Sequence, residues 1–310
     1  MEECILVSRS HPKNLRQFVA TITTKTIYRS SGNPVWRPDR RTMTLSSMRA
    51  AAVSAAALVA LIGTPASAED RDFCAERPGQ TTPPCTIEPG RFMLEVAAVS
   101  WNLTRDVGQR TDTVQLGGAV LRAGLTPRLE AQVGWTPITL QRVHDRSSGT
   151  IMRTSGTGDV SLGFLYGLAG ANGPVGVQGF VTLPTGRSGI GAGDWGAGLR
   201  LPVAIKVGPS LQFSLTPEVD AAVNSSGKGR HFAFGAAGGI GFPLSKSLGL
   251  GADVAVFRDD DPGGAATRAT SSLSLAWQVG SNTQLDIGGI VALNANSPDQ
   301  TLYFGIAHRF

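Results

Sequence analysis

The sequence predicts an all-β fold: a 12-stranded antiparallel transmembrane β-barrel of the outer-membrane type, preceded by a cleaved signal peptide. Three observations lead to this prediction. Apolar residues recur at every second position from residue 90 onward, short and long connections alternate strictly, and the chain is rich in glycine but poor in charge. Of the 310 residues, 39 are glycine and 16% are charged. This composition excludes a disordered chain and is unusual for a soluble enzyme.

The first 68 residues are expected to be processing sequence. Arg49, an apolar run over residues 50–63 and Ala66-Ser67-Ala68 match the three parts of a secretory signal peptide. The run is shorter than the roughly 20 residues that a membrane-spanning helix needs. The alternative is a buried core helix. We expect residues 43–68 to be a signal peptide cleaved near Ala68, and residues 1–42 to be an extended or non-native N-terminus.

The net charge of +5 comes from these N-terminal residues. Residues 1–68 hold nine Lys/Arg and three Asp/Glu, and the rest of the chain holds 19 Lys/Arg and 20 Asp/Glu. The exported part is therefore almost neutral, with a net charge of −1. A nucleic-acid partner is not expected.

Residues 69–89 are polar, rich in proline and without periodicity. They contain Cys74 and Cys85, the cysteines that remain after cleavage. In an exported protein such a pair predicts a disulfide that closes a short loop. The segment is expected either to plug the barrel or to extend into the periplasm.

Residues 90–310 are expected to form the transmembrane barrel. Apolar residues alternate with small or polar ones in twelve segments, which is typical of β-strands. In the sixth, Trp195 and Leu199 share one face, and Asp194 and Arg200 the other. The twelve segments are 90–101, 113–124, 128–141, 157–168, 173–183, 194–207, 210–221, 231–242, 247–257, 270–279, 283–293 and 301–310.

The connections test this assignment independently. Those after even-numbered segments are short, whereas those after odd-numbered segments are long and polar: 102–112, 142–156, 184–193, 222–230, 258–269 and 294–300. Outer-membrane barrels have an even number of strands, tight periplasmic turns and long external loops. A β-sandwich, the alternative for many short strands, has no reason to sort loop lengths in this way. Lipid offers no hydrogen-bond partners, so strands can cross it only in a closed barrel.

The last segment ends on an aromatic residue. Phe304, Ile306 and Phe310 share one face of residues 301–310, together with Leu302 and His308. This pattern resembles the C-terminal signal by which outer-membrane barrels are recognised for insertion. An aromatic end also suits the girdle at the membrane interface. We therefore expect the barrel insertion machinery to be a partner.

Several stretches together resemble an outer-membrane transporter family associated with the meta-pathway of phenol degradation. They are Ile87–Trp101, Leu121–Trp135, 156–168, Val181–Gly191 and the closing strand. The resemblance covers most of residues 87–310. It implies an exported barrel concerned with the uptake of aromatic or other small organic compounds.

Two glycine-rich stretches do not predict cofactor sites. Residues 191–196 match G-x-G-x-x-G, but a strand is expected to follow, whereas a dinucleotide site needs a helix there. Residues 224–229 resemble a phosphate loop but lack its leading glycine and the hydroxyl residue after the lysine. Both are interpreted as outer loops. No cofactor and no metal are expected.

An outer-membrane phospholipase is the enzyme alternative, because that fold also has twelve strands. It needs a serine nucleophile with a histidine base. After residue 69 the histidines are His144, His231 and His308, and His231 follows Ser225 and Ser226 closely. The short His-x-Ser arrangement of that family is absent. We do not expect an enzyme.

Charged and polar residues at inward positions are the candidates for lining the lumen. A charge on the lipid face would cost about 2–4 kcal/mol near the membrane midplane. These side chains either pair across the lumen and brace it, or line a pathway and tune its selectivity. The candidates are Glu95, Glu130, Asp159, Asp194, Arg200, Lys206, Glu218, Asp220, Asp253, Asp286, Tyr303 and Arg309.

The sequence therefore predicts a channel in the outer membrane of a Gram-negative bacterium. Barrels of about eight strands have filled interiors and those of about 16–18 have open channels, so twelve strands predict a narrow or partly plugged pore. The expected function is passive uptake of small organic solutes, aromatic or hydrophobic ones among them. The main alternative is a non-conducting structural barrel. A phospholipase-type hydrolase is the least favoured interpretation.

Overall fold

A computed structural model describes residues 71–310 of the chain. The predicted signal peptide (43–68), its cleavage near Ala68 and the N-terminus (1–42) lie outside these residues. Within them, no helix is long and apolar enough to cross a membrane. The strands are β1 (Phe92–Asp106), β2 (Gln109–Thr126), β3 (Leu129–Trp135), β4 (Ile138–Asp145), β5 (Ile151–Gly156), β6 (Val160–Gly167), β7 (Gly176–Leu183), β8 (Gly196–Arg200), β9 (Val203–Val207), β10 (Leu211–Val223), β11 (Arg230–Pro243), β12 (Leu248–Asp259), β13 (Ala266–Gln278), β14 (Thr283–Ala292) and β15 (Gln300–Arg309).

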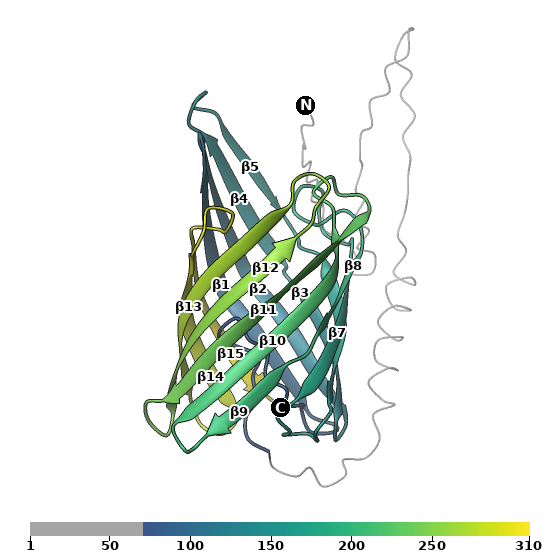
Figure 1. Ribbon diagram of the computed structural model, residues 1–310, viewed down its shortest axis with the longest axis vertical. Helices are drawn as coiled ribbons and strands as arrows, with labels where there is room; N and C mark the ends of the chain where they lie inside the picture. The colour runs from purple at the N-terminus through teal and green to yellow at the C-terminus, as the bar shows by residue number, and fades with distance from the viewer. Residues whose placement is uncertain (1–70) are drawn as a thin grey trace, which may run out of the picture. The chain divides into compact units, whose positions relative to one another are not determined.

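The strands form one closed antiparallel barrel (Figure 1). Strand β1 closes it, because it pairs with β2 on one edge and with the last strand, β15, on the other. Met93 lies opposite Arg122 in β2 and opposite Arg309 in β15. Closure leaves the barrel without an open seam, as a lipid environment requires. The strand β5 pairs only with β4 and belongs to the hairpin that extends beyond the barrel.

The fifteen strands make twelve barrel positions, which confirms the predicted strand number. Three positions are each made by two consecutive strands with a short break: β3 with β4, β5 with β6, and β8 with β9. Pro137 lies in the first break and Pro202 in the third. Proline has no N–H to donate to a neighbouring strand, so the ladder is interrupted there.

The connections alternate between the two ends of the barrel as predicted, but 168–175 at the turn end is longer than the predicted short connection. At one end, here called the loop end, lie the connections 184–195, 224–229, 260–265 and 293–299. The other, the turn end, has the connections 127–128, 168–175, 208–210, 244–247 and 279–282, together with the start of β1 and the end of β15.

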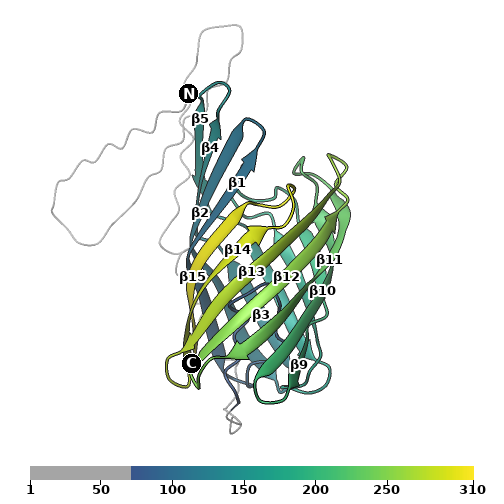
Figure 2. The same cartoon turned by 60° about the vertical axis from the view of Figure 1, so that its left-hand side comes forward.

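Two of the predicted long loops are wrong. Residues 102–112 and 142–156 form extensions of the hairpins β1–β2 and β4–β5, whose connections are only 107–108 and 146–150. Figure 2 shows these strands rising beyond their neighbours at the loop end. The sequence signal fails there because both faces of an extension meet water, so the apolar alternation ends although the backbone pairing continues.

The two faces of the wall have opposite character. Large apolar side chains lie exposed on the outside; Leu273 and Ile287, for example, are 59% and 56% exposed. The inside holds buried polar and charged groups such as Glu95, Glu130 and Asp286. This distribution is the reverse of that in a soluble protein and suits a lipid exterior.

Candidate functional site

The described residues that precede the first strand lie in the barrel lumen. Residues 71–91, here called the lumenal segment, are irregular, and their backbone N–H groups donate to acceptors on the barrel wall. These contacts include Glu76 N to Glu95 Oε1 at 3.0 Å, Arg77 N to Glu95 Oε2 at 3.0 Å, Gly79 N to the Tyr303 hydroxyl at 3.1 Å, Gln80 N to Asp253 Oδ2 at 3.0 Å, Thr82 N to Thr216 Oγ1 at 2.9 Å and Ile87 N to Glu130 Oε2 at 2.8 Å. The wall side chains thereby satisfy backbone groups that have no partner of their own in an irregular segment.

A disulfide links Cys74 to Cys85 within the lumenal segment, with their Cα atoms 6.3 Å apart. Arg122 of β2 donates to the backbone at both ends of this loop: Nη1 to the Cys74 carbonyl at 2.8 Å and Nη2 to the Cys85 carbonyl at 3.2 Å. The disulfide loop is therefore attached to the barrel wall through the two cysteines that close it.

Arg122 is also the centre of a buried ionic cluster. Its Nη1 lies 2.9 Å from Glu95 Oε1 and its Nε lies 2.7 Å from Glu130 Oε1. The side chains of Arg122 and Glu130 are fully buried, and that of Glu95 is 2% exposed. Burying one cation and two carboxylates is tolerable only because each oxygen and N–H has a partner in the cluster.

Alternation alone does not identify Arg122 as an inward residue, and the structure shows why. Val114 and Leu116 lie opposite Leu140 and Ile138, whose side chains are exposed on the outer face. Strict alternation along β2 would therefore place Arg122 on the lipid face. The pairing of β1 with β2 is interrupted at Ala98 and Gly117, β1 shifts by one residue against β15 at the same point, and Gly117 has a positive φ of 67°. This irregularity shifts the in–out phase by one residue, so that Leu121 is exposed and Arg122 is buried inside.

Two further ion pairs join the lumenal segment to the wall. Arg77 Nη2 lies 2.8 Å from Asp286 Oδ1 on β14. Arg309 Nη1, on β15, lies 2.8 Å from Glu88 Oε1 and donates to the Arg71 carbonyl at 2.8 Å. The predicted inward residues Asp286 and Arg309 thus hold the segment, as do Glu95, Glu130, Asp253 and Tyr303.

The other predicted lumen residues have different surroundings. Arg200 pairs with Glu218 at 2.9 Å on the wall. Asp159 accepts from the backbone of Gly186 and Ala192 in the connection 184–195.

The remaining three predicted lumen residues lie in a loop, at the turn end and in the barrel wall. Asp194 precedes β8, so it lies in the loop, where its Oδ1 is 3.1 Å from Arg230 Nη1. Lys206 lines a cavity at the turn end, and Asp220 contributes to a groove in the wall described below.

The predicted insertion-signal residues lie on the outer face of β15. Leu302, Phe304 and Phe310 are 55%, 41% and 61% exposed. Ile306 shares their face, and the ring of His308 contacts Phe310 edge-on, with centroids 4.6 Å apart. The alternate residues, such as Ala307 and Arg309, are buried inside.

Two cavities in the lumen border on the lumenal segment. One, of about 460 Å³, is lined by Glu76, Arg77 and Tyr303. The other, of about 640 Å³, is lined by Lys206 and other residues near the turn end. Pro78 lines both, so this part of the segment separates the two spaces.

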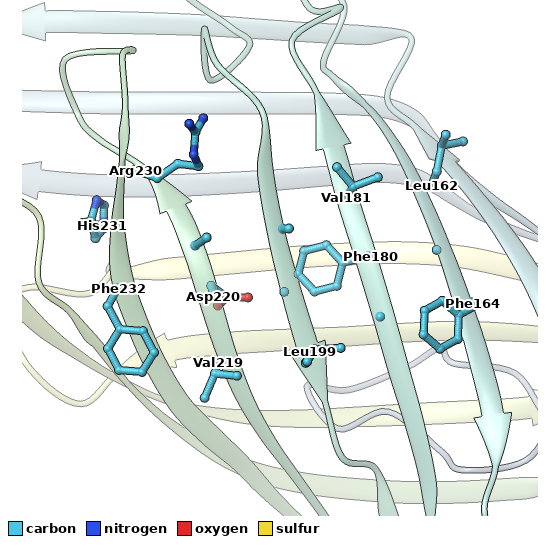
Figure 3. A pocket seen from close by; sticks show the side chains of 15 residues that line it. Leu162, Phe164, Phe180, Val181, Leu199, Val219, Asp220, Arg230, His231 and Phe232 are labelled. Carbon is cyan, nitrogen blue, oxygen red and sulfur yellow. The ribbon is translucent and has the colours of Figure 1, made fainter.

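A separate apolar groove of about 890 Å³ crosses β6, β7, β8, β10 and β11 (Figure 3). Leu162, Phe164 and Phe232, at its sides, have exposed side chains on the outer face. Small residues form its floor. A Cβ at Gly179 would lie 2.6 Å from the Phe164 ring, so glycine is needed there for the ring to lie flat.

The residues that a hydrolase would need do not come together. His231 has Asn224 Oδ1 3.0 Å from its Nδ1 and Asp259 Oδ1 2.5 Å from its Nε2. The Ser225 hydroxyl donates instead to Asp261 Oδ1 at 3.1 Å. Both ring nitrogens therefore face other groups, and the serine–histidine pair of that chemistry is not formed among these residues.

One solved structure shows the same fold, and two others are more distant. An outer-membrane channel from Pseudomonas putida F1 is 18% identical, with a TM-score of 0.57, over 76% of this chain and 99% of its own. The translocator domain of the autotransporter NalP from Neisseria meningitidis is 13% identical, with a TM-score of 0.42, over 86% and 96% of the two chains. The CymD monoaromatic hydrocarbon channel is 10% identical, with a TM-score of 0.40, over 71% and 87%. The first of these supports the outer-membrane barrel fold; the other two are too distant to add to it.

Among curated protein sequences, none matches this chain. A family model does match, and it covers residues 75–310, which include most of the lumenal segment and the entire barrel. The family is described as "Putative MetA-pathway of phenol degradation". This protein, an outer-membrane β-barrel with a filled lumen, belongs to that family.

Proposed function

We propose that the barrel is a channel for the passive uptake of small organic solutes, aromatic and hydrophobic compounds among them. The observation that carries the proposal is the position of Pro78, which lines both lumenal cavities. A short stretch of irregular chain around Pro78 therefore lies between the two spaces. Displacing it would join them into one path along the barrel.

The lumenal segment limits the size of the solutes that can pass through the barrel. The lumenal segment contacts the wall at β1, β3, β10, β12 and β15, so it crosses the lumen rather than following one side. A wide aqueous pore is incompatible with this arrangement, whereas a narrow path for small molecules is not. The description of the family refers to phenol degradation, which supports aromatic compounds as the solute class.

The surroundings of the channel follow from the same proposal. The turn end faces the periplasm, as in other barrels with short turns on that side, and the loop end faces outward. The outer face contacts membrane lipid. Export depends on a signal peptide cleaved near Ala68, and the insertion machinery recognises the last strand through Phe304, Ile306 and Phe310. No catalytic step and no cofactor are part of the mechanism.

Conductance of the purified protein in planar bilayers tests the channel. The Arg77→Ala change removes the ion pair with Asp286 close to Pro78. We expect it to raise conductance and the rate of solute flux into liposomes above those of the wild type. Arg105→Ala is the matched control, because Arg105 and Asp299 form a more exposed pair with atoms 3.8 Å apart.

The alternative, a non-conducting structural barrel, is favoured by the number of ion pairs that fill the lumen. It predicts no solute flux from either the wild type or Arg77→Ala, provided that both insert and fold. Uptake by a deletion strain compared with its parent, across a series of aromatic carbon sources, identifies the solute. Equal uptake of every compound by the two strains would contradict the channel proposal.

A further inference from the structure

A cluster of potential metal ligands lies at the loop end, apart from the lumenal segment. His231 is the second residue of β11, Asp259 is the last residue of β12, and Asp261 follows in the connection 260–265. One ligand atom from each residue lies within 4.8 Å of the other two. The His231 side chain is only 5% exposed, so it is held in place rather than free in solvent.

One ring nitrogen of His231 is held by a carboxylate. Nε2 lies 2.5 Å from Asp259 Oδ1, and the other oxygen of Asp259 accepts from Arg268 Nη2 at 2.9 Å. A carboxylate can only accept a hydrogen bond, so Nε2 carries the proton. In the neutral ring, the lone pair is then on Nδ1.

That lone pair faces other acceptors. Asn224 Oδ1 lies 3.0 Å from Nδ1, and Asp261 Oδ2 lies 3.9 Å from it. The orientation of the Asn224 amide is fixed, because its nitrogen donates to the Lys228 carbonyl at 2.9 Å. A neutral imidazole would thus place lone pairs of nitrogen and oxygen against each other. A cation between them removes this repulsion.

We propose that His231, Asp261 and Asn224 bind a divalent transition-metal ion of the Zn²⁺ class. Nδ1, Asp261 Oδ2 and Asn224 Oδ1 would be the protein ligands, and water would complete the coordination. The distances from Nδ1 to Asn224 Oδ1 and to Asp261 Oδ2 are both below about 4.2 Å, which is twice a metal–ligand bond of about 2.1 Å. One ion can therefore bind Nδ1 together with either oxygen. A nitrogen ligand selects Zn²⁺ and its neighbours in the periodic table over Mg²⁺ and Ca²⁺, which prefer oxygen alone.

Asp259 completes the arrangement without binding the ion. Histidines that bind metals usually donate the other ring N–H to a carboxylate, which fixes the tautomer and strengthens the ligand. Asp259 is in this position. The site joins β11 to the connections 224–229 and 260–265, so a bound ion would cross-link two external loops beside the groove that His231 lines.

Titration of the full exported chain in detergent, prepared without a polyhistidine tag, tests the site. Co²⁺ is the probe, because its visible absorption reports coordination by nitrogen and oxygen, and Zn²⁺ then competes for the same site. We expect saturable binding of one ion per chain in the wild type and its loss in His231→Gln and Asp261→Asn. Asp259→Asn should weaken binding about 10- to 100-fold, as loss of such a supporting carboxylate does elsewhere.

Two controls match these changes. Asp260→Asn removes a neighbouring carboxylate that pairs with Arg258 instead, and His144→Gln removes a histidine on β4. Both should bind as the wild type does. Heat-modifiable migration on a denaturing gel shows that each variant is folded. The wild type also tests the site directly, because Zn²⁺ should shift the Nδ1 resonance of His231 in ¹⁵N spectra.

Two results would overturn the proposal. One is the absence of saturable Co²⁺ or Zn²⁺ binding by the wild type; the other is equal binding by folded His231→Gln.

Discussion

Arg122 and Glu130 form a two-pronged ion pair inside the barrel, with Nε to Oε1 at 2.7 Å and Nη2 to Oε2 at 3.0 Å. Neither side chain is exposed. Arg122 belongs to β2 and Glu130 to β3, so the pair joins adjacent strands. Because the same guanidinium also holds both ends of the disulfide loop, the pair couples the wall to the lumenal segment.

Changing Arg122 to Met should therefore destabilise the barrel strongly. Loss of the cation leaves Glu95 and Glu130 buried without a positive charge, and breaking a buried ion pair in this way costs about 3–5 kcal/mol. Urea unfolding in detergent measures the change. The double variant Arg122→Met/Glu130→Gln should recover part of the loss, because one unpaired charge is removed. An unchanged urea midpoint for Arg122→Met would contradict the role of the cluster.

Removing the disulfide should loosen the lumenal segment without unfolding the barrel. The bond between Cys74 and Cys85 closes the loop that carries Glu76, Arg77 and Gly79, and an open loop has more conformational entropy to lose. We expect Cys74→Ser/Cys85→Ser to raise conductance and current noise in planar bilayers. A reductant should produce the same effect in the wild type and none in the variant. If it raises the conductance of both equally, the effect does not come from this bond.

The loop contact of Asp194 should depend on pH. Hydrogen bonds from the backbone N–H of Gly229 and of Trp195 hold the pKa of Asp194 below its ordinary value, and Arg230 adds to this. A lowered folded-state pKa means that the carboxylate stabilises the contact at every pH above the ordinary aspartate value. This contribution is lost as the pH falls through the lowered pKa.

Trp195 reports this transition. The Arg230 guanidinium lies 3.9 Å from the centre of its ring, so release of Arg230 from Asp194 should change its fluorescence. The difference in emission between the wild type and Trp195→Phe should change only below the ordinary aspartate pKa. The same difference measured on an Asp194→Asn background should be independent of pH in that range. A midpoint at or above the ordinary value would contradict the prediction.

The lipid-facing assignment can be tested with a single charge. Ile287 is 56% exposed on the outer face of β14. Ile287→Arg should reduce the free energy of folding into lipid vesicles by about 2–4 kcal/mol if the residue lies near the membrane midplane. Gln212→Arg places the same charge toward the cavity at the turn end and should cost much less. Equal losses for the two variants would mean that the faces are assigned incorrectly.

The sequence was sufficient for the wall of this barrel and for the strand number. Period-two alternation is a local property, and it persists wherever one face meets lipid and the other the lumen. It ends where both faces meet water, and for this reason the extended hairpins β1–β2 and β4–β5 could not be distinguished from loops. It also changes phase at Ala98 and Gly117, which hid Arg122.

The contents of the lumen were harder to predict. Inward carboxylates such as Glu95 and Asp286 could be identified from alternation, but their partners could not. Those partners are backbone N–H groups and arginines in an irregular segment that has no periodic signal, and they are as many as 209 residues apart along the chain, as for Arg77 and Asp286. Such pairings depend on the closed barrel, which brings distant strands around one short stretch of chain.

The contact of Arg309 with Glu88 has a consequence for assembly. Arg309 ends the strand whose pairing with β1 seals the cylinder, and Glu88 belongs to the stretch enclosed by it. Sealing and enclosure therefore favour each other thermodynamically. If the segment were outside the lumen, the ion pair between Arg309 and Glu88 would be lost. Closure of β15 on β1 is therefore less stable in an empty barrel.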